Sequence, residues 1–331
     1  MPFTVCVSTE YDRDLIMPAL EPLRPRARLT FGPVVGRSVT RAELLAAAAG
    51  ANAVIASDET FDAAVFAALP ELRLVTRDGM GYNSVDLEAA TAHGVLVTNS
   101  PVMHIATANF AMGLITALVR RIIVADRAVR EQGWTRRELF LAPGLDAMTL
   151  GIIGYGNIGR GVGQRAIAHG MEVLAFSRGL SAAQAQRDGV RLAPVERILG
   201  DSDVVSLHVP LTDLTRGLIG TAQLARMRPG SYLVNTSRGA VVDEAALIEA
   251  LRSGHLAGAA LDVFQEEPVA PDNPLLAMDN TILAPHIGSD TTVATVRAVE
   301  VCVENILAYL EGARPPNLLN PQALADSDGN S

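Results

Sequence analysis

The stretch Thr149-Leu-Gly-Ile-Ile-Gly-Tyr-Gly-Asn-Ile-Gly-Arg160 decides how the rest of the chain is interpreted. A short apolar run stops at Gly154, and Gly156 and Gly159 follow at the spacing G-x-G-x-x-G before a helix-compatible segment. A buried parallel strand that turns sharply into a helix has this pattern, and its helix N-terminus can hold a pyrophosphate on backbone N–H groups. The motif alone is weak, but the strand and helix context favours dinucleotide binding over an ordinary βα turn.

Length and composition favour a protein of two domains with sizeable apolar cores. The chain has 331 residues, of which 49% are hydrophobic, and its formal net charge is −9. That length suggests two domains, and the lack of a basic run argues against nucleic acid as a main partner. Cys6 and Cys302 lack metal-ligand spacing, so we expect neither a disulfide nor a metal site, and a reducing cytoplasm. We expect no signal peptide and no membrane span, and the apolar stretch 105–119 predicts a buried helix.

Apolar strand-like runs alternate with helix-like segments on both sides of the glycine motif, which predicts βαβ units and parallel sheets. Before the motif, strands are expected at 3–7, 53–56, 72–75 and 95–97. From the motif onward, six strands are expected at 150–153, 172–176, 204–208, 232–235, 258–262 and 281–284. The segment 106–129 keeps the helical period throughout, and another helix is expected at 291–310. Two sheets predict a ligand cleft between them.

Three further segments carry a family resemblance: Asn235-Thr-Ser-Arg-Gly-Ala-Val-Val-Asp-Glu244, Ala259-Ala-Leu-Asp-Val-Phe-Gln-Glu-Glu-Pro268 and Leu283-Ala-Pro-His-Ile-Gly-Ser289. With the glycine motif they resemble the D-isomer-specific 2-hydroxyacid dehydrogenase family, from about residue 75 to about residue 301. The resemblance implies a flavodoxin-like substrate-binding domain of residues 1–100 and 290–331. An NAD(P)-binding Rossmann domain of residues 101–289 would be inserted into it. Two crossing helices near 102–125 and 290–311, and a homodimer through the cofactor domains, are also implied.

The same resemblance implies hydride transfer between a nicotinamide and C2 of a 2-oxo or 2-hydroxy acid, and three side chains suit the chemistry. Arg238 can fork onto the substrate carboxylate and polarise its carbonyl. His286 is the natural proton donor near neutral pH. Glu267, rather than its neighbour Glu266, would stabilise the imidazolium. The alternatives are a surface ion pair for Arg238 and a structural hydrogen bond for His286.

Further binding residues are expected along the same motifs. Asp262 would accept a hydrogen bond from the nicotinamide carboxamide, or else cap a turn. The backbone N–H groups of Met80 and Gly81 would hold the substrate carboxylate together with Arg238 and His286. The expected cofactor residues are Gly154, Gly156, Asn157, Ile158, Gly159, Ser177, Arg178, Val209, Pro210, Thr215, Thr236, Ser237, Asp262 and Gly288.

Two residues are left without a firm role. Asn109 stands where many relatives carry an acidic residue. Phe140 resembles an aromatic that some hydroxypyruvate reductases present to a partner's active site, and a core aromatic is the alternative.

The cofactor preference depends on the residues directly after the strand at 172–176. An NAD site needs an acidic residue about 20 positions after the glycines to hold the ribose hydroxyls. Here Ser177 and Arg178 come after the strand instead. A hydroxyl and a guanidinium suit a 2′-phosphate, so we expect NADP to be preferred, with NAD possible.

The predicted function is an NAD(P)-dependent reductase of small 2-oxo acids such as glyoxylate or hydroxypyruvate. A phosphoglycerate dehydrogenase-like enzyme is a close alternative, and a phosphite dehydrogenase is a more distant one. A nucleotide-sensing corepressor on the same scaffold, which binds the cofactor without turnover, is the alternative from another class. No metal is expected in the site.

Overall fold

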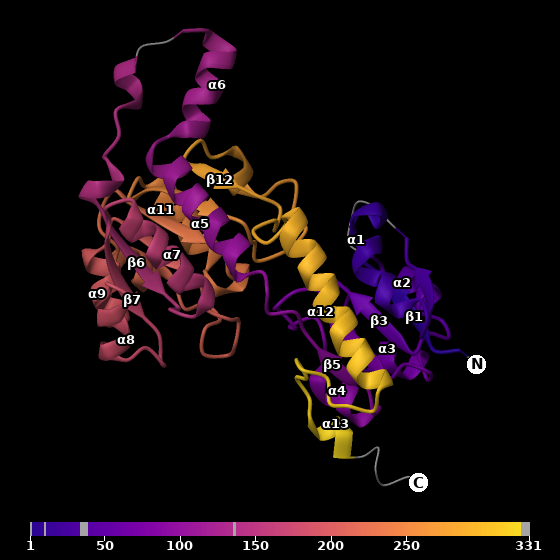
Figure 1. Cartoon of the computed structure of the whole chain (residues 1–331). Coiled ribbons are helices and arrows are strands. Elements are labelled where there is room, and N and C mark those ends of the chain that lie inside the picture. Colours follow the sequence, from indigo (N-terminus) through magenta and orange to yellow (C-terminus); the bar gives the residue numbers. More distant parts are fainter. Residues whose placement is uncertain (1, 10, 34–38, 135–136, 326–331) are drawn as a thin grey trace. The chain divides into compact units, whose positions relative to one another are not determined.

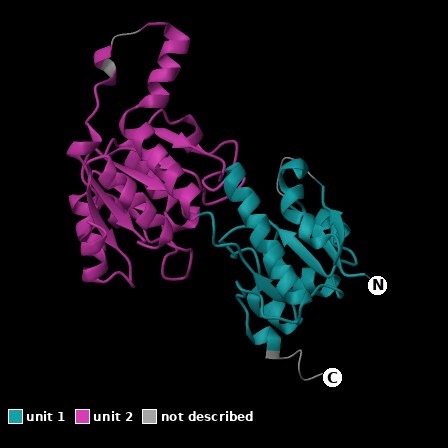
Figure 2. Ribbon diagram, in the orientation of Figure 1, with its two compact units in different colours: residues 1–103, 290–331 teal, residues 104–289 magenta. Residues whose placement is uncertain are grey.

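The structure is a computed structural model, which describes residues 2–9, 11–33, 39–134 and 137–325. The chain divides into two compact units, which Figure 2 shows in different colours. Unit 1 consists of residues 1–103 and 290–331, and unit 2 consists of residues 104–289.

Unit 1 is built on a five-stranded parallel sheet with the strand order β2-β1-β3-β4-β5. Its strands are β1 (Thr4–Val7), β2 (Arg28–Phe31), β3 (Ala53–Ala56), β4 (Leu74–Arg77) and β5 (Leu96–Thr98). Strand order reverses between β1 and β3, which is where such sheets open toward ligands at their carboxyl ends. Strand β2 was not predicted, because its four residues lie at the sheet edge and none of them is buried.

Helices cover both faces of this sheet and bury apolar side chains in two cores, one around Phe66 and the other around Leu20 and Val299. A sheet that is buried on both faces needs near-continuous apolar strands, as Ala53–Ala56 shows. The helices are α1 (Arg13–Leu20), η1 (Glu21–Leu23), α2 (Arg41–Ala47), α3 (Ala63–Ala68), α4 (Leu87–Ala92), α12 (Thr292–Leu310) and α13 (Gln322–Ala325).

Unit 2 contains a seven-stranded parallel sheet with the order β12-β11-β10-β9-β6-β7-β8. The strands are β6 (Thr149–Ile153), β7 (Glu172–Phe176), β8 (Arg191–Leu192), β9 (Val204–Leu207), β10 (Ser231–Asn235), β11 (Leu256–Leu261) and β12 (Thr281–Leu283). Six match predicted strands, and the two-residue β8 was too short to predict. The order on both sides of β6 is that of a doubly wound Rossmann sheet. The predicted fold class, two parallel-sheet α/β domains, is confirmed.

Helices also cover both faces of the sheet in unit 2, around one core that includes Ile115 and Val162 and a second that includes Ile198 and Leu247. The helices of this unit are α5 (His104–Val119), α6 (Ile122–Gln132), η2 (Arg137–Phe140), η3 (Leu145–Ala147), α7 (Asn157–Ala168), α8 (Ala182–Arg187), α9 (Val195–Asp201), α10 (Thr221–Arg226), η4 (Gly239–Val241), α11 (Glu244–Arg252) and η5 (Pro274–Ala277).

The prediction of one helix over 106–129, and of a crossing helix reaching 125, was wrong. Helix α5 ends at Val119, Arg121 adopts a left-handed φ of 53°, and α6 starts at Ile122 with a bend of 57°. The apolar period continues across the break, but α6 buries none of its residues and projects from the rest of unit 2 (Figure 1). Among the described residues, no single helix has the length and hydropathy to cross a membrane, although the bent pair α5 and α6 has them by composition.

Candidate active site

Most of the predicted site residues of unit 2 follow the carboxyl ends of its strands. Because all these strands are parallel, their carboxyl ends form one edge of the sheet, where α/β proteins bind ligands. The residues at this edge are Gly154 after β6, Ser177 and Arg178 after β7, Val209 and Pro210 after β9, Thr236, Ser237 and Arg238 after β10, Asp262 after β11, and His286 after β12.

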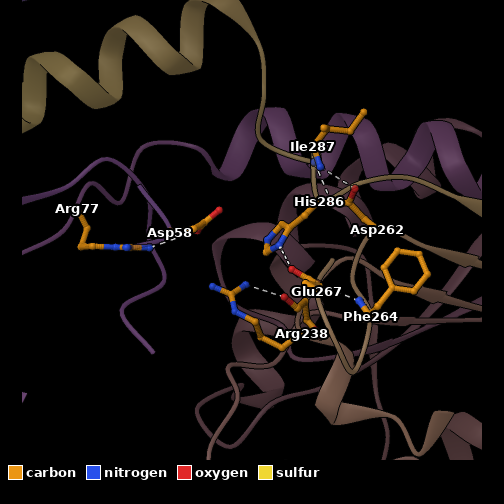
Figure 3. A network of polar contacts seen from close by, with 10 residues as sticks. Asp58, Arg77, Arg238, Asp262, Phe264, Glu267, His286 and Ile287 are labelled. Carbon is orange, nitrogen blue, oxygen red and sulfur yellow. Dashed lines mark hydrogen bonds and ion pairs between the residues drawn. The ribbon is translucent and has the colours of Figure 1, made fainter. Parts of the chain in front are cut away.

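The carboxylate of Glu267 holds the His286 ring in place (Figure 3). Its Oε2 lies 2.8 Å from His286 Nδ1, while its Oε1 accepts a hydrogen bond of 2.9 Å from the backbone N–H of Phe264. The Glu267 contact is made at Nδ1 of the imidazole. The structure thus pairs His286 with Glu267, the carboxylate that sequence reasoning preferred over Glu266.

Arg238 faces the same carboxylate. Its backbone is extended, its side chain is half-buried, and Nη1 donates to Ser237 O at 2.7 Å. Burial raises the pKa of Glu267, but the hydrogen bond and charge of His286, the Phe264 N–H and the Arg238 charge together lower it below its usual value. Glu267 is therefore held as an anion between two groups that can carry positive charge.

Sequence reasoning gave no role to Asn235, which shapes the loop that carries Arg238. Its Oδ1 accepts from the backbone N of Ser237 at 3.0 Å and from the Ser237 hydroxyl at 2.7 Å. Its Nδ2 donates to Arg238 O at 3.0 Å. Side-chain amides that bond nearby backbone in this way fix a turn. An Asn at a strand end, two residues before a turn, was the signal available in the sequence.

Gly239 joins the Arg238 loop to the Glu267 loop. A Cβ at this position would lie 1.8 Å from Phe264 O and 2.5 Å from Gln265 N, so only glycine fits. The same Phe264 donates its N–H to Glu267. The close approach of these two loops therefore sets the distance between the guanidinium and the carboxylate.

Asp262 fixes the turn that presents His286. Its two carboxylate oxygens accept the backbone N–H groups of Ile287 and Gly288, at 2.9 and 2.8 Å (Figure 3). His286 has a φ of 58°, a left-handed conformation that costs free energy in a non-glycine residue. The two hydrogen bonds hold the chain there. The structure thus shows the alternative given for Asp262, a carboxylate that holds a turn, while the predicted contact with a carboxamide stays a prediction.

The glycine turn fits a dinucleotide. Gly154 has a φ of 102°, and a Cβ there would lie 2.5 Å from the backbone of His208. At Gly159 a Cβ would lie 2.2 Å from Gly154 O, whereas Gly156 faces open space. Gly156 precedes α7 without a side-chain cap, so the first N–H groups of the helix, those of Asn157, Ile158 and Gly159, suit an anion.

Two more of the predicted cofactor residues, Thr236 and Thr215, make hydrogen-bond contacts on this edge. His208, which sequence reasoning passed over, contacts Ser206 Oγ at 2.8 Å and Thr236 Oγ1 at 3.4 Å, and loss of solvation lowers its pKa to about 4. Thr215 donates to Pro210 O at 2.6 Å and closes the loop after Val209.

The residues directly after β7 are more open to solvent. Ser177 is half-buried, and Arg178 is exposed with no ion-pair partner in the described part of the chain. No carboxylate comes after β7 where an NAD-type ribose contact would need one.

Met80 and Gly81 belong to unit 1, in the loop after β4. Gly79 O accepts from Ser100 N at 3.1 Å, and Met80 O accepts from Asn99 Nδ2 at 2.9 Å. The C=O and N–H of one trans peptide point in opposite directions. The N–H groups of Met80 and Gly81 therefore point away from Ser100 and Asn99.

The two residues without a firm role make contacts between elements of unit 2. Asn109 Oδ1 accepts from Arg165 Nε at 2.6 Å and links α5 to α7. Phe140 is half-buried, and its ring centroid lies 5.9 Å from the guanidinium carbon of Arg121.

Comparisons with known proteins identify the family of the chain. Residues 112–288 match the family described as D-isomer specific 2-hydroxyacid dehydrogenase, NAD binding domain. A glyoxylate reductase of Korarchaeum cryptofilum is 44% identical over 270 residues, which is 80% of this chain and 81% of that protein. A D-3-phosphoglycerate dehydrogenase of Archaeoglobus fulgidus is 38% identical over 89% of this chain but only 56% of its own length.

Solved structures give the same result. The crystal structure of a glyoxylate reductase from Paecilomyes thermophila superimposes with a TM-score of 0.83 at 30% identity, covering 97% of this chain and 100% of that one. The TT0316 protein of Thermus thermophilus gives 0.86 at 38% identity, covering 96% of this chain and 100% of that one. The resemblance found in the sequence is confirmed: the chain belongs to the D-isomer-specific 2-hydroxyacid dehydrogenase family and is a nicotinamide-dependent oxidoreductase of that family.

Proposed function

We propose that the enzyme reduces a small 2-oxo acid such as glyoxylate or hydroxypyruvate, with Arg238, Glu267 and His286 as its catalytic residues. The observation that carries the proposal is the Glu267 carboxylate, which contacts His286 Nδ1 at 2.8 Å and faces Arg238 at the carboxyl edge of the Rossmann sheet. Several of the most similar relatives are glyoxylate reductases, which supports this substrate class.

Each of the three residues has a distinct part in the reduction. A bound nicotinamide supplies the hydride that reduces C2. The Arg238 guanidinium binds the substrate carboxylate and draws electron density from the carbonyl oxygen. His286 donates the proton at Nε2 to that oxygen as it gains negative charge, and Glu267 stabilises the imidazolium before the transfer. Hydride and proton together convert the 2-oxo acid into the 2-hydroxy acid.

Met80 and Gly81 are the proposed backbone donors for the substrate carboxylate. Their N–H groups point away from the Ser100 N–H, which donates to Gly79 O, and from the Asn99 side chain, which donates to Met80 O. Two successive N–H groups in a glycine-rich turn form a concave anion site. This is the part that unit 1 contributes to the proposed function.

The proposed cofactor is NADP, because Ser177 and the exposed Arg178 come directly after β7 and no carboxylate stands there to repel a 2′-phosphate. Asn157, Ile158, Thr236, Ser237, Asp262 and Gly288 complete the proposed cofactor site. The kcat/KM ratio for NADPH over NADH is expected to exceed one. In Arg178→Ala, the KM for NADPH should rise about tenfold and the KM for NADH should change little. Higher kcat/KM with NADH in the parent enzyme would overturn the preference.

A homodimer through the cofactor units is also proposed. The arm formed by α6 and the segment after it exposes large apolar side chains that a second copy could cover: Ile122, Ile123, Val129, Trp134 and Leu141. Molar mass from light scattering tests this proposal, since a monomer at micromolar concentration would contradict it. A cytoplasmic location is proposed because Cys6 and Cys302 are both buried free thiols.

A substrate panel at fixed NADPH tests the function directly. Glyoxylate, hydroxypyruvate, a bulkier 2-oxo acid and a phosphorylated three-carbon 2-oxo acid should be compared by kcat/KM. The first two are expected to be the best substrates. Preference for the phosphorylated acid would favour a phosphoglycerate dehydrogenase-like enzyme. Tight NADPH binding without turnover of any acid would favour a cofactor-sensing binding protein and overturn the proposal.

A further inference from the structure

Unit 1 buries three ionisable side chains at the carboxyl edge of its own sheet, which we call the Glu59–Arg77–Asp78 cluster. Glu59 follows β3, and Arg77 and Asp78 lie at the end of β4. Each of the three is only 4–5% exposed. Charged side chains are almost never buried so completely unless they are paired, so the cluster needs an explanation.

The cluster is only partly satisfied by hydrogen bonds. Ser8 Oγ donates to Glu59 Oε1 at 2.6 Å, and Ser57 Oγ donates to Asp78 Oδ2 at 2.5 Å. Arg77 Nη2 lies 3.5 Å from an oxygen of the exposed Asp58 (Figure 3). Glu59 Oε2 and the Nε and Nη1 atoms of Arg77 are buried without a hydrogen-bond partner among the described residues.

The charges in the cluster do not balance. One guanidinium stands against two buried carboxyls, so a net charge of −1 would remain if both were ionised. Among the described side chains that interact with Asp78, Arg77 is the cation, Glu59 and Asp58 are acidic, and Tyr11 and Cys302 are neutral at physiological pH.

Tyr11 is in turn close enough to Asp290 to interact with its charge. Burial raises the pKa of Asp78 to about 7, against the lowering effects of the Ser57 hydroxyl and the Arg77 charge, and burial also raises the pKa of Glu59. The physical expectation is one retained proton near neutral pH.

Asp78 is also the first residue of the loop that offers the Met80 and Gly81 N–H groups. Its own N–H donates to Ala56 O at 3.0 Å, and its carboxyl is tied to Ser57 on the loop after β3. A negative charge at Asp78 would lie two residues from a site meant for an anion. A neutral carboxyl keeps the same anchor without that repulsion.

We propose that the Glu59–Arg77–Asp78 cluster holds one exchangeable proton, and that protonated Asp78 is a positioning residue for binding of the substrate carboxylate at Met80 and Gly81. This inference rests on the proposed function, since it concerns the same substrate loop. Substrate binding and proton binding are then linked: the anion favours the protonated cluster, and loss of the proton weakens the anion site.

The kinetic test measures the KM for glyoxylate and kcat from about pH 6 to pH 9. In the parent enzyme, KM should rise several-fold above neutral pH. In Asp78→Asn, an isosteric and permanently neutral side chain, KM should stay flat while kcat keeps the parental pH dependence. The control is Asp58→Asn, an exposed acid on the same sheet edge, in which the rise should remain but begin at a lower pH, because the Asp58 charge raises the pKa of Asp78. The same KM rise in Asp78→Asn as in the parent would overturn the inference.

A second variant, Ser57→Ala, tests the inference independently if Asp78→Asn does not fold. Ser57→Ala removes the hydroxyl that favours the ionised form of Asp78, so the rise in KM should move to higher pH. A rise that stays at the parental pH in Ser57→Ala would contradict the role of Asp78.

Carbon-13 NMR of the carboxyl groups separates this inference from the proposed function. A carboxyl that titrates near neutral pH in the parent, and is absent in Asp78→Asn, supports the retained proton even if none of the acids is turned over. If every carboxyl of the parent titrates below about pH 5.5, the inference fails while the reductase activity can still stand. Added glyoxylate should move the titration to higher pH, and no movement would break the proposed link to substrate.

Discussion

The two units place acidic side chains at the same kind of sheet edge and treat them in opposite ways. In unit 2, both oxygens of Glu267 accept hydrogen bonds or ion-pair contacts, and Arg238 adds positive charge. In unit 1, Glu59 keeps one buried oxygen without a partner among the described residues. The pKa of Glu267 is lowered in consequence, and that of Asp78 is raised to about 7 by burial. Depth of burial and the donors that face a carboxyl, rather than its position on the strand, decide whether it is charged.

This difference gives the two acids opposite effects on stability. Because the pKa of Glu267 is lowered, its charge stabilises the folded state at pH values above the usual pKa of a glutamate. That contribution is lost as the pH falls through the folded-state pKa. Asp78, with a raised pKa, opposes folding as the pH rises from its usual value of 3.8 toward about 7. One edge is built to keep a charge, and the other to avoid one.

The largest expected effect is a loss of turnover when the proton donor is removed from the charged edge, the sheet edge of unit 2 that carries Arg238, Glu267 and His286. In His286→Ala, kcat for glyoxylate should fall by about 10²- to 10⁴-fold, because general acid catalysis is removed. The kcat of Arg238→Ala should fall comparably, and both variants should bind NADPH nearly as the parent does. The control is His169→Ala, which lies at the far end of α7 and is exposed. Near-parental turnover in purified His286→Ala or Arg238→Ala would reject the assignment.

A smaller loss is expected when the two loops of the charged edge are pushed apart. In Gly239→Ala, the new Cβ would collide with Phe264 O and displace the loop that holds Glu267. We expect kcat/KM to fall by roughly 10²-fold, as for other small misplacements of catalytic groups, with a lower Tm. Gly200→Ala is the control, because a Cβ there meets nothing within 4 Å. Parental kinetics in Gly239→Ala would show that the loop contact does not set the geometry.

A shift in pH dependence, more than a loss of rate, is expected from Glu267→Gln. Without the anion, the imidazolium of His286 is less stabilised, so the reductase should lose activity at a lower pH than the parent. A displacement of about one to three pH units is typical for a removed opposite charge. The kcat profile with glyoxylate measures it. Glu266→Gln is the matched control, and an equal displacement in both variants would refute the choice of Glu267.

The smallest expected effect is a change of stability at the neutral edge, the sheet edge of unit 1 that carries Asp78. Asp78→Asn cannot ionise, so its Tm should exceed that of the parent by a few degrees at about pH 8 and match it near pH 4. Calorimetry at the two values measures the difference. Asp58→Asn should show no such pattern, because that side chain is 81% exposed. A Tm difference that does not change with pH would remove the contrast between the two edges.

Local signals carried much of the fold. Apolar runs of four to six residues predicted most strands of both sheets, and the glycine motif located the turn between β6 and α7. Failures arose where packing overrode the pattern. Strand β2 has no buried residue to reveal it, and α6 continues the apolar period of α5 although none of its residues is buried.

The sequence alone determined the alternation of strands and helices, the family, and the identity of Arg238, Glu267 and His286 as candidates. Those properties are written in local patterns of a few residues, which the chain keeps wherever it folds. Only the tertiary structure decided which carboxyl meets which donor: that Glu267 Oε2 lies 2.8 Å from His286 Nδ1, and that Asp78 is tied to Ser57. Hydrogen bonds and pKa values depend on distances of tenths of an ångström between residues far apart in the chain, and these are fixed only when the sheet and its loops have packed.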